Sequence, residues 1–159
     1  MFIPAKILNK PDKLTDEEFA IMKTHTLIGY KMCMDDIKLR PYALGPKYHH
    51  ETLDGMGYPE GLVGNLIPYE DQIIKVADDY DALVTKRQYK THIHISDTLK
   101  DLIKDTEPNI KVAALDNAAQ GVKLGKLNKK VVKALFKVVI DDTYYEISCV
   151  TGYVDYLKD

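Results

Sequence analysis

The sequence predicts a single, predominantly helical domain, and three observations support this fold class. The chain has 159 residues, an ordinary single-domain length that allows one hydrophobic core. Apolar residues recur at helical spacing in segments 69–86 and 129–142. The sequence Thr-Asp-Glu-Glu at residues 15–18 has the pattern of a capping box, which marks the start of a helix.

Composition and charge limit the class of protein. The hydrophobic share of 45% and the charged share of 29% are typical of globular proteins. A net charge of -2 argues against a nucleic-acid polymer as partner, although local basic groups can still bind phosphate. No apolar run approaches the ~20 residues that span a bilayer, and the N-terminus lacks a signal-peptide pattern. Cys33 and Cys149 are too few for a disulfide framework and are expected to be buried thiols, so we expect a cytoplasmic protein.

The first part of the chain is expected to contain a loop and two helices. Residues 1–13 hold two prolines and show no period, which predicts an entering loop. A helix then begins after Thr15, with an acidic first turn that suits the helix dipole. Gly29 is a mild breaker and Arg40-Pro41 a stop, so 42–50 is expected as a short second helix that carries a histidine pair. The apolar stripe of the first helix is expected at Phe19, Met22, Leu27 and Tyr30.

The middle and end of the chain alternate between a long loop and further helices. Four glycines and two prolines exclude regular structure from residues 51–68, the glycine loop, and a loop of this length is usually functional. Helices are expected over 69–86, from Ser96 to 104, over 107–119 and after an Asn128 cap, with a turn at 121–125. The tail from Thr143 is expected as a short strand pair or a docked extended segment. The buried stripes are expected at Ile73, Val76, Ala77, Tyr80 and Val84 and, in the last helix, at Val131, Val132, Leu135, Phe136 and Val139.

Histidines and a carboxylate from three predicted helices suggest a metal site. His25, His49, His50 and Asp78 could converge as ligands do in helical bundles. Adjacent histidines on a helix diverge by about 100°, so the pair suits two metal ions better than one. Two ions roughly 3.5 to 4 Å apart can clamp both oxygens of a phosphoryl displacement. Such a thiol-free site favours iron, manganese, zinc or nickel.

The same residues also allow a structural explanation. An isolated histidine pair usually lies on the surface or in a satisfied core pair, so its spacing alone does not establish a metal site. The carboxylates at 78, 79 and 81 can form a solvated helix face, which is expected for Asp79, although the first and third share nearly one side of the helix. His92 and His94 lack acidic neighbours and are expected to be structural.

The glycine loop and the basic residues after it suggest a phosphate-bearing ligand. Glycines at 55 and 57 allow positive φ and close approach of backbone N–H groups to a ligand, while Tyr58-Pro59 adds an aromatic face and a fixed turn. A phosphate or guanine base could rest there, or the loop is a turn with its tyrosine packed into the core. Arg87 and Lys90 suit the end of a helix dipole, or they hold substrate phosphates.

One ordered series of motifs matches a known family. It runs from IP at residues 3–4 and KPxKLTxEEFxxMKxH at 10–25, through HHExxDGxGYP at 49–59 and IP at 67–68, to ADxxDAL at 77–83. This series resembles the HD-GYP family of bacterial cyclic di-GMP phosphodiesterases, which belong to the HD superfamily of metal-dependent phosphohydrolases. The similarity covers roughly residues 3 to 105.

The resemblance implies an all-α helical bundle, with residues 1–105 as the C-terminal portion of an HD-GYP domain and 106–159 as a helical extension of that domain. In this family a metal-bound hydroxide opens cyclic di-GMP to pGpG or continues to GMP, with two divalent ions, iron or manganese favoured. The implied metal ligands are His25, His49, His50 and Asp78, and the implied substrate contacts are Tyr58, Arg87 and Lys90. The implied supporting residues are Glu51, Asp54, Gly55, Gly57, Pro59 and Asp81.

Two departures from the family pattern are visible. Arg87-Gln88-Tyr89 stands where the family usually has Arg-Pro-Tyr. The sequence contains no His-Asp dipeptide, and the family's dyad and its following lysine would precede Ile3, so no catalytic residue is assigned. We expect a chain truncated before the dyad, with apolar surface uncovered.

The missing residues could come from an upstream segment or a second chain, and regulatory-domain and homodimer partners stay open. The alternatives are a catalytically silent cyclic di-GMP-binding or protein-interaction module, and an HD hydrolase of another nucleotide.

Overall fold

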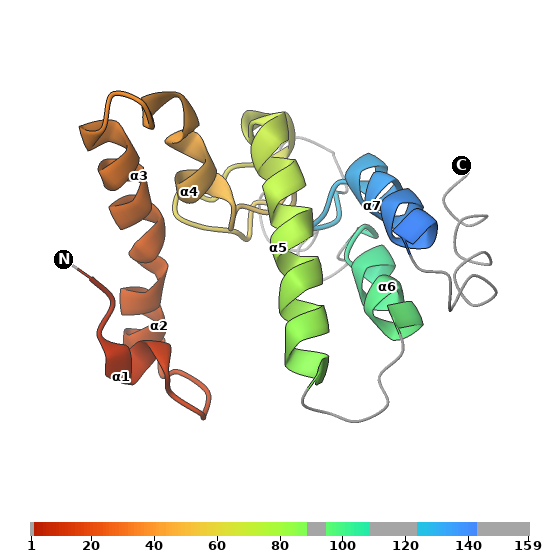
Figure 1. The fold of residues 1–159 in the computed structure, drawn as a ribbon, viewed down its shortest axis with the longest axis horizontal. Coiled ribbons are helices and arrows are strands. Elements are labelled where there is room, and N and C mark those ends of the chain that lie inside the picture. The colour runs from red at the N-terminus through yellow and green to blue at the C-terminus, as the bar shows by residue number, and fades with distance from the viewer. Residues whose placement is uncertain (1, 89–94, 109–123, 143–159) are drawn as a thin grey trace.

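The computed structural model describes residues 2–88, 95–108 and 124–142, and these residues are helical without a strand (Figure 1). This agrees with the all-α fold class. The described elements are α1 (Ala5–Leu8), α2 (Asp16–Lys23), α3 (His25–Asp35), the 3-10 turn η1 (Arg40–Tyr42), α4 (Leu44–Tyr48), the 3-10 turn η2 (Gly64–Leu66), α5 (Tyr69–Gln88), α6 (Ile95–Lys104) and α7 (Lys129–Asp142).

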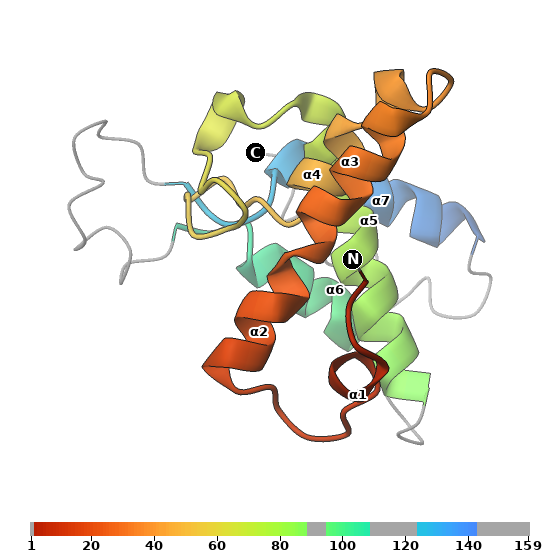
Figure 2. The same ribbon diagram turned by 90° about the vertical axis from the view of Figure 1, so that its left-hand side faces the viewer.

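The long helix α5 separates two groups of helices. In Figure 1, α6 and α7 lie on one side of α5 and the segment from α1 to α4 lies on the other. Figure 2, turned by 90°, shows α1, α2 and α3 in front of α5. Contacts follow this order: α4 packs against both α3 and α5, while α5, α6 and α7 all contact one another. Helix α4, with the glycine loop that follows it, therefore connects the two groups.

The hydrophobic core lies among α5, α6 and α7. Helix α7 begins as predicted, because the side-chain oxygen of Asn128 accepts from the Lys130 N–H at 2.9 Å. Its predicted apolar face is confirmed, since four of the five residues are buried and Leu135 packs against them. The core residues are Val76, Leu99, Leu102, Ile103, Leu127, Val131, Val132, Phe136 and Val139.

The start of α2 is the capping box that the sequence predicts. The Thr15 hydroxyl accepts from the Glu18 N–H at 3.3 Å, and the Glu18 carboxylate accepts from the Thr15 N–H at 2.8 Å. The helix is shorter than expected, because it ends before Thr24 and α3 begins at His25. The Thr24 hydroxyl donates to the Ile21 carbonyl at 2.6 Å, and this local bond competes with continuation of the helix.

Three other local predictions need correction. Residues 5–8, expected as loop, form α1, which buries Ile7. Gly29 does not break α3; a Cβ there would lie 2.8 Å from the Pro46 Cβ, so the glycine allows α3 and α4 to approach closely. Segment 42–50 is not one helix, because it splits between η1 and α4 and the histidine pair follows α4.

Several residues expected in buried stripes are exposed. Phe19 on α2 is 44% exposed, because α2 packs mainly against its chain neighbours α1 and α3. Leu27 on α3 is 48% exposed. On α5, Val76 is buried as expected, but Ile73 is 46% exposed and Ala77 is exposed too. The side of α5 that faces α6 and α7 is centred on Val76, with Tyr80 and Leu83 beside it.

The remaining predictions fall partly or wholly outside the described residues. Ser96 lies inside α6 rather than before it. Cys33 is partly exposed rather than buried. Most of the predicted helix at 107–119, most of the turn at 121–125, Cys149 and the tail from Thr143 lie outside the described residues. Among the helices that are described, none combines the length and apolar character needed to cross a membrane.

Candidate metal centre

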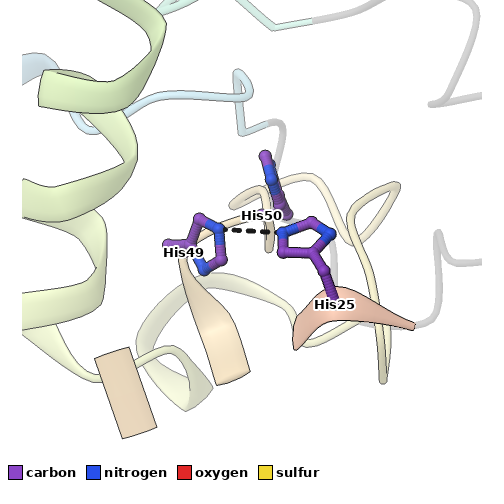
Figure 3. Close-up of side chains that lie close together, drawn as sticks. All are labelled: His25, His49 and His50. Carbon is purple, nitrogen blue, oxygen red and sulfur yellow. Dashed lines mark hydrogen bonds between the residues drawn. The ribbon is translucent and has the colours of Figure 1, made fainter. Parts of the chain in front are cut away.

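Three histidines from two places in the chain meet beside α4. His25 opens α3, whereas His49 and His50 directly follow α4. Each offers one ring nitrogen to a group whose nitrogen atoms lie within 4.8 Å of one another (Figure 3). All three side chains are half-buried. We call these residues the histidine cluster.

Backbone carbonyls fix the tautomers of two of these rings. The His25 Nδ1 lies 2.8 Å from the Met22 carbonyl, and the His49 Nδ1 lies 2.9 Å from the Pro46 carbonyl. A carbonyl oxygen only accepts, so in both rings Nδ1 carries the proton and the neutral form leaves a lone pair on Nε2. The second nitrogen of a metal-ligating histidine is usually held in this way.

The two Nε2 atoms lie only 3.2 Å apart, along the dashed line in Figure 3. Two lone pairs at this distance repel each other unless a proton or a cation lies close to both. Burial, followed by the nearby charge of His25, lowers the pKa of His49. Burial, followed by the charges of His49 and Lys75, lowers the pKa of His50 to about 3. These rings are therefore neutral at physiological pH, which is the form that binds metals.

Asp78 stands at the edge of the histidine cluster. Its Oδ2 lies 3.9 Å from the His50 Nδ1, and its side chain is 44% exposed. The neighbouring Asp79 is turned to Lys75 in an ion pair at 2.6 Å, and Asp81 is exposed. Of the three predicted carboxylates, Asp78 is therefore the one that the fold directs to the histidines.

Tyr58 forms an aromatic wall of the site. Its ring stacks on His50, with the ring centroids 4.7 Å apart and the planes at 26°. Burial, followed by the charges of Asp78 and Asp79, raises the pKa of the Tyr58 phenol to about 12. The hydroxyl therefore stays protonated and can donate a hydrogen bond. The Tyr58 ring is half-buried and lies against the histidine cluster, so it is not packed fully into the core as the structural interpretation expected.

Glu51 fixes the glycine loop from inside. This carboxylate is 1% exposed. It accepts hydrogen bonds from the backbone N–H groups of Glu60, Gly61 and Leu62 at 2.7, 3.1 and 2.9 Å. Three hydrogen bonds to one carboxylate hold this part of the loop in place. The loop that carries Tyr58 is thereby tied to the residue next to His50.

The loop glycines serve the fold of the loop itself. Gly55 has a positive φ of 78°. At Gly57, a Cβ would lie 2.4 Å from the backbone of Glu51, so the close approach expected toward a ligand is made to the chain's own backbone. The Tyr58-Pro59 peptide is cis. Asp54 accepts from the Thr52 hydroxyl at 2.6 Å, and its other carboxylate oxygen is buried without a hydrogen-bond partner among the described residues.

Some predicted site residues lie outside the described part of the chain, whereas two residues that were not predicted for the site adjoin it. The side chain of Arg87, as well as Lys90, His92 and His94, lies outside what the structure describes. Phe19 and Lys23, by contrast, lie beside Tyr58. Their spacing of four residues, just before His25, is the signal by which the sequence could have indicated them.

Comparisons with known proteins identify the family. The profile of the HD domain matches residues 1–109. The chain belongs to the HD domain family. This confirms the family recognised from the histidine and glycine motifs, together with its helical fold.

Named relatives of this HD domain are phosphodiesterases. The chain is 47% identical over 90 residues to the cyclic di-GMP phosphodiesterase response regulator RpfG of Xanthomonas campestris pv. campestris, covering 55% of this chain and 24% of that protein. It is 37% identical over 107 residues to the cyclic di-GMP phosphodiesterase PdeB of Borreliella burgdorferi, covering 67% and 28%. It is 42% identical over 91 residues to the 3'3'-cGAMP-specific phosphodiesterase 2 of Vibrio cholerae, covering 55% and 17%. The matched segment thus covers between 17% and 28% of each relative's length.

Proposed function

We propose that this HD domain is part of a metal-dependent phosphodiesterase that hydrolyses cyclic di-GMP to pGpG or GMP. The observation that carries this proposal is the histidine cluster, in which the rings of His25 and His49 are held by their Nδ1 atoms and their Nε2 atoms lie 3.2 Å apart. The similarity to named cyclic di-GMP phosphodiesterases supports the substrate.

The donor set fits divalent metal ions. His25, His49 and His50 supply imidazole nitrogens, and Asp78 can add a carboxylate oxygen from α5. A nitrogen- and oxygen-rich site without thiols suits iron, manganese, zinc or nickel, and we favour iron or manganese. Bound ions would supply a hydroxide at neutral pH and stabilise the charge that develops on the phosphorus oxygens. We propose two ions, because the resemblance to the HD-GYP family implies two.

The chain's own residues would orient the ligands and the substrate. The Met22 and Pro46 carbonyls hold the rings of His25 and His49 by their Nδ1–H groups. Tyr58 supports His50 by stacking and presents a protonated hydroxyl as a donor for substrate oxygen. Arg87 and Lys90 remain our proposed phosphate contacts, because a guanidinium and an ammonium suit phosphate oxygens.

Metal content is the first test of this function. Protein purified with manganese or iron should contain bound metal, and His49→Ala and Asp78→Ala should lower the amount. Asp79→Ala is the matched control, because its carboxylate is paired with Lys75 rather than directed to the histidines. Absence of bound metal in wild-type protein under these conditions would refute the proposed metal site.

Turnover is the second test, with the longest natural form of the protein. Cyclic di-GMP, 3'3'-cGAMP and other nucleotides should be compared, with preferential release of pGpG or GMP as the expected result. Binding of cyclic di-GMP without turnover would instead support the cyclic di-GMP-binding module. Turnover of a different nucleotide alone would assign another substrate.

A further inference from the structure

We propose that Phe19 and Lys23 extend the candidate site onto α2 as a second subsite for a cyclic dinucleotide. In this subsite Lys23 binds the phosphodiester that is not being cleaved, and Phe19 packs against an adjoining base. The inference rests on the proposed function and adds two residues to it that the predicted substrate contacts did not include.

The aromatic wall of the site continues from the glycine loop onto α2. Tyr58 stacks on His50, and the edge of Phe19 meets Tyr58 at a centroid distance of 6.0 Å and an angle of 84°. Phe19 is 44% exposed, and α2 buries no residue. The Phe19 ring is therefore free to pack against a ligand, and aromatic side chains bind nucleotide bases by stacking.

Lys23 brings a positive charge to the same aromatic wall. Lys23 lies one helical turn after Phe19, on the same side of α2. Its Nζ is 5.2 Å from the Phe19 centroid and 6.0 Å from the Tyr58 centroid. The ring that contacts His50 thus also contacts this ammonium group, so the charge lies close to the histidine cluster without belonging to it.

The charge of Lys23 is available to an anion. Within the part of the chain that the structure describes, Lys23 forms no ion pair with a carboxylate. Two other lysines near the histidines already form ion pairs, Lys47 with Glu60 and Lys75 with Asp79, each at 2.6 Å. A lysine that has only aromatic partners loses little when it moves to a phosphate oxygen.

The chemistry of a cyclic dinucleotide matches this arrangement. The ligand carries two phosphodiester groups on opposite sides of one ring, with a base beside each. When one phosphodiester lies at the histidine cluster, the other needs a cation and its base needs an apolar face at a short distance. Lys23 and Phe19 supply these two groups on one helix face.

The test is calorimetric binding of cyclic di-GMP to the manganese-loaded protein. Lys23→Gln should weaken binding about ten- to a hundredfold, since hydrogen bonds to charged groups contribute at this level. Lys23→Arg should stay within about threefold of wild type, and Phe19→Leu should weaken binding about tenfold, as loss of one base stack does. Wild-type affinity should fall with added salt more steeply than that of Lys23→Gln. Lys38→Gln, beyond the far end of α3 and roughly 15 Å from its start, is the matched control and should bind like wild type.

Each result separates the subsite from the function on which it rests. If wild type binds cyclic di-GMP and Lys23→Gln and Phe19→Leu bind it equally well, the subsite is wrong and the proposed function stands. If wild type binds metal but no dinucleotide, the proposed function and the subsite are both wrong. Because α2 contributes nothing to the core, the variants should unfold at the wild-type temperature. Equal manganese content in all variants should show that weaker binding is not a loss of metal.

Discussion

Replacing Glu51 by glutamine should loosen the glycine loop, because this side chain holds the loop by three backbone hydrogen bonds. One carboxylate oxygen accepts from Glu60 and Gly61, and the other accepts from Leu62. In Glu51→Gln the amide oxygen can keep the first two bonds. The amide nitrogen is itself a donor and would face the Leu62 N–H, which would lose its partner in a buried place.

The size of the effect follows from this geometry. An unsatisfied buried donor costs about 1 to 3 kcal/mol, and the two remaining bonds lose the strengthening that an ionised acceptor gives. We therefore expect Glu51→Gln to lower the free energy of unfolding by about 2 to 4 kcal/mol. Exposed Glu70, in the first turn of α5, is the control, because Glu70→Gln should change stability by less than about 1 kcal/mol.

Two measurements check this prediction. Urea unfolding followed by circular dichroism gives the change in stability. Hydrogen exchange should show that the amides of residues 60–62 lose protection in Glu51→Gln, whereas amides of α7 in the core lose protection only as far as global stability falls. A variant with wild-type stability and wild-type protection at 60–62 would refute the anchoring role of Glu51.

Two further predictions concern the core and an isolated carboxyl group. Phe136→Ala should destabilise the protein by about 3 to 5 kcal/mol, since this residue is 1% exposed. The control Val138→Ala, at a 57% exposed position, should cost less than about 1 kcal/mol. Similar unfolding midpoints for the two variants would contradict the packing described for α7. Burial, followed by the charge of Glu70, raises the pKa of Asp71 to about 6, and one of its buried oxygens has no partner among the described residues. Because the folded-state pKa is raised, the contribution of Asp71 to the free energy of unfolding is fully present below about pH 4 and is lost as the pH rises through 6. Relative to Asp71→Asn, wild type should therefore lose about 2 kcal/mol over this range. Parallel stability curves of the two proteins from pH 4 to 7 would contradict this.

Short-range signals allowed the helices to be predicted. The Thr15 capping box and the Asn128 cap each act over two or three residues, and both are present in the structure. The apolar face of α7 is also local, because one helix with one apolar stripe can bury it in only one direction. Even the convergence of the three histidines could be anticipated, because the motif spans both chain segments that supply them.

Burial on α2 and α5 could not be predicted in the same way. Phe19 and Ile73 occupy positions with helical periodicity, but whether such a face is buried depends on which distant elements pack there. The anchoring of residues 60–62 by Glu51 is equally non-local in its geometry. The family motif indicated a supporting role for Glu51, but only the folded loop shows that all three partners are backbone N–H groups.

The short distance between two imidazoles that repel each other when neutral must be imposed by the fold, and α3 and α4 explain how. Gly29 follows His25 by one helical turn, and Pro46 precedes His49 by about one turn. At this crossing a Cβ on Gly29 would lie 2.8 Å from the Pro46 Cβ, so α3 and α4 can pack this closely only because residue 29 is glycine. Pro46 also accepts the Nδ1–H of His49 and so sets the ring that faces His25. The residue that the sequence indicates as a helix breaker thus brings the two Nε2 atoms within 3.2 Å, a distance that a shared cation would stabilise.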